Sequence, residues 1–178
     1  MKKGIIIIGA GGHGKVVADA ILKANSFELI GFVDANTPIG TTIFSDYKVI
    51  ERQENVESLI NDETMFVLGI GNTQIRENIS KQLSSNISWA TIIHPSAIIG
   101  KDVNIGKGSV VLANVVINIG SKVGDFAIVD SGVIIDHDCE IGNFCHLSIG
   151  TVIGSNSNLK SAGLKTELGQ VFAPFSSI

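Results

Sequence analysis

The chain has 178 residues, of which 44% are hydrophobic and 6% aromatic, and its 17 acidic and 13 basic side chains give a net charge of −4. This balance excludes an intrinsically disordered chain and leaves no excess of positive charge for a nucleic acid or an anionic membrane surface. No apolar run reaches the roughly 18 residues of a membrane-spanning helix, and the two cysteines, Cys139 and Cys145, lack the spacing of a disulfide framework or a metal site. We therefore expect a cytoplasmic globular protein without a metal, a membrane segment or a nucleic-acid partner.

The first 90 residues alternate short apolar runs with polar stretches that suit helices. Residues 5–8, four isoleucines, are typical of a parallel strand that is buried on both faces. A turn with glycines from Gly9 to Gly14 follows, and the apolar residues from Val16 to Ile21 then recur at helical spacing. Further strands are expected at 29–33 and 65–70, and helices at 55–60 and 74–83. Strands and helices that alternate in this way predict a small parallel α/β domain over residues 1–90.

From residue 93 onward the sequence follows a six-residue repeat. Every sixth residue is a large aliphatic: Ile93, Ile99, Ile105, Val111, Ile117, Val123, Val129, Ile135, Ile141, Leu147 and Ile153. The residue four positions after each of them is small or β-branched. A period of six excludes the face of an α-helix, where neighbours lie three and four residues apart. The pattern predicts a solenoid of short strands and tight corners over residues 91–158, in which three hexapeptides form one triangular coil.

This repeat resembles the left-handed parallel β-helix of hexapeptide-repeat acyltransferases. The handedness is implied by the resemblance alone, because crossover connections between parallel strands are ordinarily right-handed. The resemblance also implies a homotrimer, with active sites in the grooves between subunits.

The repeat loses its frame after Ser157. Leu159 keeps the register, but the next position in frame is Lys165, and no recognisable corner follows. Apolar residues at 164, 168 and 172 lie at helical spacing. We therefore expect residues 159–178 to be a divergent tail, either a short helix that covers the open end of the coils or an altered end that leaves a cofactor groove incomplete.

The glycine-rich turn matches a dinucleotide-binding fingerprint. It satisfies the pattern G-x-G-x-x-G between a strand and a helix, and Asp34 follows 20 residues after Gly14. Glycines allow a sharp turn, and the amide groups at the start of the helix can hold a phosphate, although plain turn geometry explains Gly9 and Gly11 equally well. Residues 1–90 are too few to form both lobes of a full dinucleotide-binding fold.

Four segments in this order resemble one family. They are GAGGHGKVV from Gly9, FVD ending at Asp34, GIGN ending at Asn72 and followed by Arg76, and IIHPSA ending at Ala97. They are similar to the sugar O- and N-acyltransferases that include sialic acid O-acetyltransferases and UDP-amino-sugar acetyltransferases. The resemblance implies that an α/β domain similar to half a Rossmann fold binds a nucleotide sugar and that the β-helix binds acetyl-CoA. The residues it assigns to the nucleotide sugar are Gly12, His13, Gly14, Lys15, Asp34, Gly71 and Asn72, although a first-turn lysine such as Lys15 is often merely solvated.

The segment 135–150, IDHDCEIGNFCHLSIG, resembles the active-site stretch of the same family. His137 lies two residues after the inward Ile135, so its ring is expected at a corner, facing the groove of a neighbouring subunit. Acyl transfer needs a base with a pKa near neutrality, which histidine provides, and a carboxylate that orients the ring. Asp136 and Asp138 are both candidates, and the family pattern favours Asp138. The resemblance places His146 near the thioester of acetyl-CoA.

Three functions are compatible with these patterns. The first is direct transfer of an acetyl group from acetyl-CoA to an amine or hydroxyl of a nucleotide-linked or sialic-type sugar, with His137 as base, Asp138 holding it, and backbone amides with His146 stabilising the oxyanion. A cysteine nucleophile is not expected, because the register turns Cys139 inward. The second is a shortened homologue that binds a nucleotide sugar or only trimerises, and the loss of the repeat after Ser157 favours it. The third is a nicotinamide-dependent oxidoreductase based on the glycine turn and Asp34.

Overall fold

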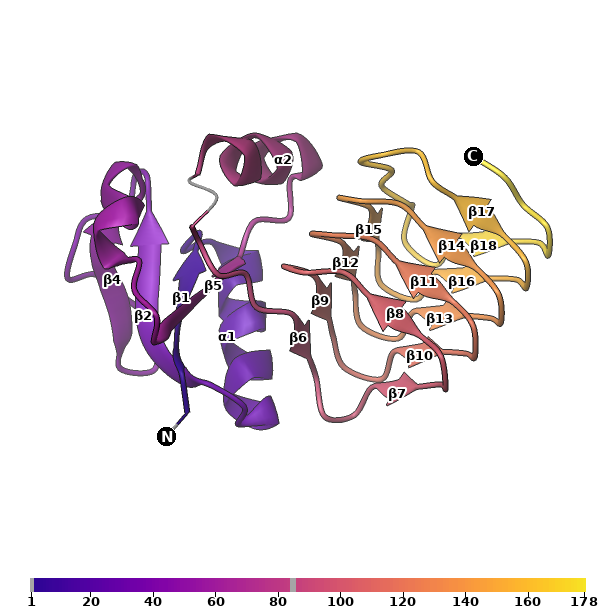
Figure 1. The fold of residues 1–178 in the computed structure, drawn as a ribbon, viewed down its shortest axis with the longest axis horizontal. Coiled ribbons are helices and arrows are strands. Elements are labelled where there is room, and N and C mark those ends of the chain that lie inside the picture. Colours follow the sequence, from indigo (N-terminus) through magenta and orange to yellow (C-terminus); the bar gives the residue numbers. More distant parts are fainter. Residues whose placement is uncertain (1, 84–85) are drawn as a thin grey trace.

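The computed structural model of the chain describes residues 2–83 and 86–178. An N-terminal α/β half and a C-terminal solenoid of stacked coils lie side by side (Figure 1). One side of the solenoid faces the α/β half, so residues far apart in the sequence meet at the junction between the two halves.

The N-terminal half is built around a mixed sheet. Its elements are β1 (Gly4–Ile8), α1 (Gly12–Ala24), β2 (Glu28–Asp34), β3 (Thr42–Phe44), β4 (Tyr47–Arg52), the 3-10 helix η1 (Gln53–Leu59), β5 (Thr64–Leu68) and α2 (Thr73–Gln82). The sheet order is β3-β4-β2-β1-β5; β4, β2, β1 and β5 run parallel, and β3 is antiparallel to β4. The isoleucine run forms β1, which is buried because it lies between β2 and β5 and packs on both faces. The expected half-Rossmann arrangement is confirmed.

The hairpin of β3 and β4 is not predicted by the sequence pattern. Its turn is made by Ser45, which has a positive φ of 50°. In β4 the apolar pair of Val49 and Ile50 lies between Lys48 and the charged residues Glu51 and Arg52, so the apolar signal of this strand is too short to recognise. β4 nevertheless pairs with β2, and it thereby carries the start of η1 to the carboxyl edge of the sheet.

The glycine-rich turn lies at the point where the sheet changes direction. After β1 the chain passes through α1 to β2 on one side, whereas β5 lies on the other side of β1. The carboxyl ends of strands diverge at such a switch point and leave a crevice in which ligands bind. A Cβ atom on Gly14 would collide with the carbonyl oxygen of Gly9. Only glycine therefore lets the first turn of α1 approach the turn so closely.

The C-terminal half is a parallel β-helix, as the repeat predicts. Its strands are β6 (Ile92–Ile93), β7 (Ile98–Ile99), β8 (Asn104–Ile105), β9 (Val110–Val111), β10 (Val116–Ile117), β11 (Lys122–Val123), β12 (Ile128–Val129), β13 (Ile134–Ile135), β14 (Glu140–Ile141), β15 (His146–Leu147), β16 (Val152–Ile153), β17 (Asn158–Leu159) and β18 (Val171–Phe172). Residues 18 positions apart pair in parallel, as Val116 does with Ile98 and Ile134, so three hexapeptides make one coil. Such stacked short strands are typical of the left-handed β-helix that the resemblance implies.

The second residue of each strand points into the solenoid and forms its core. From Val111 to Leu159 each of these aliphatic residues is at most 4% exposed. Cys139 and Cys145 are buried among them at corner positions, as the register predicts. The corners are made by residues with positive φ at positions 102, 108, 114, 120, 126, 132, 138, 144, 150 and 156. A left-handed backbone turns the chain sharply after each strand, which glycine, asparagine and aspartate tolerate best.

The expected helix in residues 159–178 is wrong, because this segment completes another coil. β17 and β18 continue the stack, and bridges join His146 to Lys165 and Asn158 to Ser177. The next positive φ angles fall at positions 163, 169 and 175, so the corner after β17 contains one extra residue. Paired residues are therefore 19 positions apart in this coil, and the inward position moves from Lys165 to Thr166.

The buried Thr166 hides this coil from the repeat pattern, because its side chain is polar. Its Oγ1 accepts a hydrogen bond of 2.8 Å from the backbone N–H of Ser148 and lies 2.8 Å from Oγ1 of Thr151. Ser148 in turn donates its hydroxyl proton to the carbonyl oxygen of Thr166. The hydroxyl groups satisfy one another, as buried polar groups must, and a threonine can therefore stand where the repeat predicts an aliphatic.

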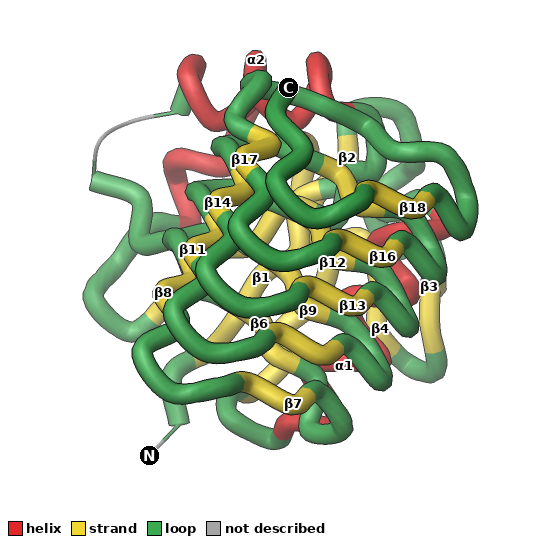
Figure 2. Tube along the Cα trace, turned by 90° about the vertical axis from the view of Figure 1, so that its right-hand side faces the viewer, coloured by secondary structure: helices red, strands yellow, loops and turns green. Residues whose placement is uncertain are grey.

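The three faces of the β-helix differ in what their outward residues meet. The inner face (β6, β9, β12, β15) lies against the α/β half, and its outward residues Ile92, Val110, Ile128 and His146 are buried. The aliphatic face (β7, β10, β13, β16, β18) carries Ile98, Val116, Ile134, Val152 and Val171, and the polar face (β8, β11, β14, β17) carries Asn104, Lys122, Glu140 and Asn158. Figure 2 shows the aliphatic and polar faces from the side away from the α/β half.

Candidate active site

His137 lies at the corner between β13 and β14, where the aliphatic face meets the polar face; we call this corner the outer edge. The side chain is 46% exposed, and its Nδ1 lies 2.8 Å from Oδ2 of Asp138. The hydrogen bond with Asp138, reinforced by the charges of both neighbouring carboxylates, raises the pKa of His137. Because a carboxylate only accepts hydrogen bonds, Nδ1 carries the proton and Nε2 is left as the basic nitrogen.

The two candidate carboxylates have different partners. Oδ1 of Asp136 accepts hydrogen bonds from the side chain of Asn118 and from the backbone N–H of His137, and these bonds lower the pKa of Asp136. Asp138 contacts the ring itself, which is the arrangement that the family pattern favours. Gly120 lies beneath Asp138 with a φ of +76°, and a Cβ atom there would lie 2.5 Å from Oδ1 of Asp138. A glycine at this corner therefore leaves room for the carboxylate that orients His137.

The cysteines near this histidine are not suited to nucleophilic chemistry. Both side chains are buried, and burial raises the pKa of Cys139 and Cys145. The Sγ atom of Cys139 lies 3.2 Å from the carbonyl oxygen of Gly154, to which it donates. A protonated, buried thiol is a filler of the corner.

A second candidate site is a pocket of about 310 Å³ at the switch point of the sheet. It is lined by the glycine turn, the end of β2, the start of η1 and the turn after β5, with residues Gly9, Gly11, Gly12, His13, Asp34, Ala35, Asn36, Gln53, Gly69, Ile70, Gly71 and Ile75. Five of these twelve lining residues are glycines, and one of them, Gly12, is the first residue of α1. The free backbone N–H groups at the start of a helix suit a phosphate group. We call it the switch-point pocket.

The pocket gathers four of the seven predicted binding residues, namely Gly12, His13, Asp34 and Gly71. The other three lie outside its lining. Gly14 is buried against Gly9, Lys15 is exposed on the first turn of α1, and Asn72 caps α2 by accepting a hydrogen bond from the N–H of Ile75.

Asp34 holds the loops of the pocket in place. Its carboxylate accepts hydrogen bonds from the backbone N–H groups of Ala10, Asn36 and Thr37, at 2.8, 3.0 and 2.8 Å. Burial opposes ionisation of this group, but the three bonds prevail and lower its pKa. Asp34 thus fixes the glycine turn relative to β2, and its predicted contact with a nucleotide sugar stays a prediction.

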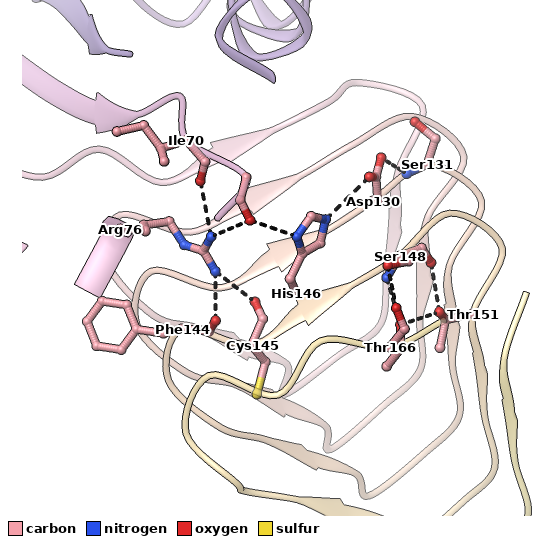
Figure 3. Close-up of polar contacts among 11 residues, drawn as sticks. Ile70, Arg76, Asp130, Ser131, Phe144, Cys145, His146, Ser148, Thr151 and Thr166 are labelled. Carbon is pink, nitrogen blue, oxygen red and sulfur yellow. Dashed lines mark hydrogen bonds and ion pairs between the residues drawn. The ribbon is translucent and has the colours of Figure 1, made fainter. Parts of the chain in front are cut away.

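His146 lies in β15 on the inner face, beneath the turn after β5. It is 8% exposed, and its Nδ1 donates to the carbonyl oxygen of Gly71 at 3.0 Å (Figure 3). Its Nε2 lies 3.6 Å from Oδ2 of Asp130. Both ring nitrogens therefore face oxygen atoms of this chain, and the predicted contact of His146 with acetyl-CoA stays a prediction.

His13 lies above His146, with 6.2 Å between the centres of the two rings. Burial is the main cause that lowers the pKa of His13 to about 4, and the nearby His146 adds to it. The ring is therefore neutral at neutral pH, and its buried Nε2 has no hydrogen-bond partner within the described chain. The turn after β5, His13, His146 and Asp130 thus form one cluster at the junction of the two halves.

The structure places His137 and His146 in different surroundings. His137 lies on the corner opposite the inner face, whereas His146 points from that face toward the α/β half. A single protomer does not bring them together. An active site that uses His137 and the switch-point pocket at once therefore needs two protomers.

Sequence reasoning misses several residues of these sites. Asn36 and Gln53 line the switch-point pocket, but Gln53 follows the strand β4 that the pattern does not reveal. Asp130 meets His146 only because β12 and β15 are adjacent coils. The 18-residue coil length is a usable signal, since it places residue 128 beside residue 146 and brings Asp130 close to it.

Within the described residues no group of three or more histidine, cysteine, aspartate or glutamate side chains could hold a metal ion. None of the helices in residues 2–83 and 86–178 has the length and apolar character needed to cross a bilayer.

Comparison with known proteins links both halves to one kind of enzyme. Residues 4–83 match the family model described as the PglD N-terminal domain. A UDP-N-acetylbacillosamine N-acetyltransferase of Bacillus subtilis (strain 168) is 28% identical over 112 residues, 62% of this chain and 52% of the relative. The match thus spans about half the length of this curated relative.

Solved structures extend the likeness to almost the whole chain. The acetyltransferase domain of PglB from Neisseria gonorrhoeae FA1090, in complex with acetyl coenzyme A, is 29% identical with a TM-score of 0.74 and covers 99% of this chain and 88% of its own. A perosamine N-acetyltransferase of Caulobacter crescentus, with one histidine changed to asparagine and bound to CoA and GDP-perosamine, is 26% identical with a TM-score of 0.80 and covers 98% and 90%. Residues 4–83 thus match the PglD N-terminal domain family, and both halves of the chain are similar to these solved acetyltransferase structures.

Proposed function

We propose that this protein is an acetyl-CoA-dependent N-acetyltransferase that acts on a nucleotide-linked amino sugar and works as a homotrimer. The observation that carries the proposal is the exposed pair of His137 and Asp138 on a β-helix whose α/β half presents a glycine-lined pocket. The relatives support the amine as acceptor, because the Bacillus and Caulobacter enzymes are both named as N-acetyltransferases of nucleotide sugars.

The switch-point pocket supports a nucleotide sugar as substrate. Its glycine turn and the first turn of α1 offer backbone N–H groups to a diphosphate. The first turn of α1 carries no acidic side chain that would repel the diphosphate. Gly12, His13, Asp34 and Gly71 are the predicted contacts that lie in this pocket.

The mechanism that we propose is direct transfer with His137 as general base. The amine of the sugar attacks the thioester carbonyl, the new C–N bond forms, and Nε2 of His137 takes the amine proton. The C–S bond then breaks, and the sulfur of coenzyme A takes that proton from Nε2, so coenzyme A leaves as the free thiol. Asp138 holds the ring and stabilises the imidazolium, because its carboxylate accepts from Nδ1. No acyl-enzyme is needed.

The aliphatic face supports the homotrimer. Its outward residues form a stripe of isoleucine and valine along the stack, and Ile98 and Ile134 are 64% and 41% exposed in the single protomer. Aliphatic stripes of this kind are typical of protein interfaces. The outer edge with His137 borders this face, so a neighbour packed on it would cover one side of the histidine. We propose that the neighbour's switch-point pocket completes the site.

The structure weakens the interpretation as a shortened, inactive homologue. That interpretation rests on the broken repeat after Ser157, and residues 159–178 instead form a further coil. A groove of about 370 Å³ on the polar face is lined by residues of β11 and β14 and of the turns that follow β11, β14 and β17, among them Lys122, Glu140 and Lys160. Both lysines pair with Glu140, so their charges are partly neutralised there.

The proposal is tested with the purified protein, acetyl-CoA and a UDP- or GDP-linked 4-amino sugar. Release of free thiol that depends on the amino sugar, together with an N-acetylated product by mass spectrometry, is the expected result. Binding of UDP or GDP by calorimetry without any thiol release would instead support a binding protein. Saturable binding of NADH with no nucleotide-sugar binding would favour the oxidoreductase.

A further inference from the structure

Arg76 is a buried cation that joins the two halves of the molecule. It lies in α2 and is 1% exposed, although arginine is rarely buried without a carboxylate partner. Among the described residues only backbone carbonyl groups accept its hydrogen bonds. Burial lowers the pKa of Arg76 to about 10, so the guanidinium remains charged at neutral pH.

The carbonyl groups come from two distant parts of the chain. On one side, Nε donates to the oxygen of Phe126 at 2.9 Å, and Nη2 donates to those of Phe144 and Cys145 at 2.7 and 3.4 Å. These residues lie at the corner between the polar face and the inner face, in two successive coils. On the other side, Nη1 donates to the oxygens of Ile70 and Gly71 at 3.1 and 3.2 Å. Figure 3 shows the guanidinium between the carbonyl group of Ile70 on one side and those of Phe144 and Cys145 on the other.

The carbonyl oxygen of Gly71 is a shared acceptor. It accepts from Nη1 of Arg76 and also from Nδ1 of His146, whose other nitrogen faces Asp130. Two donors from α2 and from β15 therefore fix the orientation of this peptide group. Gly71 and Ile70 line the switch-point pocket, whereas Arg76 itself does not.

We propose that Arg76 is a positioning residue that holds the turn at residues 69–72 in its nucleotide-binding conformation by tying it to the β-helix. The inference rests on the proposed function for the identity of the ligand. Its physical basis is that a planar guanidinium with five N–H groups can bridge carbonyl groups of separate segments in fixed directions, which a lysine ammonium cannot do. Without this bridge, the hydrogen bond from His146 to the carbonyl oxygen of Gly71 is what still ties the turn to the β-helix within the described part of the chain.

The test uses the full chain with Arg76→Met and Arg76→Lys, and Lys81→Met as a matched control. Lys81 lies on the same helix but is exposed and pairs only with Glu77. Calorimetry with UDP and with GDP gives the nucleotide affinity, and steady-state assays give KM for the amino sugar and for acetyl-CoA. Arg76→Met is expected to raise the nucleotide Kd and the sugar KM about tenfold, with KM for acetyl-CoA unchanged and a smaller rise for Arg76→Lys.

Hydrogen exchange of the peptide that spans residues 69–75 gives a readout without any ligand, and faster exchange in Arg76→Lys is expected. If that exchange and the nucleotide affinity equal those of the unmodified chain, the inference is wrong. The inference is also wrong if the Arg76 variants change KM for the amino sugar and KM for acetyl-CoA together, in step with a lower melting temperature. Arg76 would then stabilise the whole fold and not this turn in particular. A wild-type chain that binds neither nucleotide and releases no thiol refutes the proposed function, whereas the exchange experiment still decides on Arg76.

Discussion

Two histidines of the β-helix, nine residues apart, show how one repeat can build two different environments. His137 stands at a corner with nearly half of its side chain exposed and has one partner, Asp138. His146 stands on a strand, is covered by the α/β half and has an oxygen atom within 4 Å of each ring nitrogen. His137 is therefore open to solvent, and in the proposed function a neighbouring protomer completes its site, whereas His146 is already enclosed. The position in the hexapeptide places His137 at a corner and His146 on a strand. The face of the β-helix then decides burial, because Ile134 at the same hexapeptide position as His146 is 41% exposed.

The proposed chemistry at the exposed site depends on the imidazole of His137, and its removal has the largest expected effect on the rate of acetyl transfer. In His137→Asn the basic Nε2 is lost, so the rate of acetyl transfer should fall about 10²–10⁴-fold, measured as thiol release. The side chain is exposed and supports no core contact, so the melting temperature should stay unchanged. Thiol release at the wild-type rate from a folded His137→Asn protein would refute the proposed base.

The second prediction concerns what completes the open site. Ile134→Lys places a charge in the middle of the aliphatic face, where a neighbour would have to bury it, and should convert the trimer to a monomer in sedimentation velocity. Activity should fall about a hundredfold, because His137 then loses the partner surface that orients substrate beside it. Asn104→Lys, at the equivalent outward position on the polar face, is the matched control and should remain an active trimer. A trimer that persists in Ile134→Lys would exclude the aliphatic face as the interface.

The third prediction asks whether Asp138 tunes His137. A Cβ atom at Gly120 collides with the carboxylate of Asp138, so Gly120→Ala should displace it and lower the pKa of His137 toward its ordinary value of 6.5. The base acts when it is neutral, so the acidic limb of the pH profile should move to lower pH, with kcat reduced about tenfold. Gly132→Ala is the control, because Gly132 has a similar φ of +71° but open space around it. Both variants carry the backbone strain of about 1–2 kcal/mol, and equal pH profiles in the two would contradict the prediction.

The smallest effect is expected at the cysteine beside the open site. Ser121, Cys139 and Ser157 occupy the same corner in successive coils, and all three are buried. Cys139→Ser therefore continues a column of hydroxyl groups and should cost at most about 1 kcal/mol in the free energy of unfolding. The rate of acetyl transfer should be unchanged. A large loss of rate would indicate a thiol intermediate after all.

The solenoid is predictable from the sequence because its contacts recur at a fixed distance. The inward aliphatics and the outward position of His137 all follow from the six-residue period. The last coil escapes the pattern for two physical reasons: one corner is a residue longer, and the inward Thr166 is satisfied by hydroxyl groups instead of apolar packing. The helical spacing of Leu164, Leu168 and Phe172 does not correspond to a helix, since these residues lie in a coil of the β-helix.

The junction between the halves is much harder to predict. The contact of His146 with Gly71 joins residues 75 positions apart, and that of Arg76 with Phe144 joins residues 68 apart. Neither follows from a period or a motif, since both depend on how the α/β half packs on the inner face. The sequence therefore predicts the turn at residues 69–72, but it does not predict that Arg76 and His146 donate hydrogen bonds to this turn.

The extra residue in the last coil bears on how the molecule unfolds. A stack of coils gains stability from each neighbour in turn, much like a one-dimensional chain of coupled units. The first coils are anchored by the α/β half, while the coil with the extra residue replaces an aliphatic rung with Thr166. The β-helix should consequently open first at the coil that contains Thr166, so that amide protons in β18 exchange earlier than those near β9.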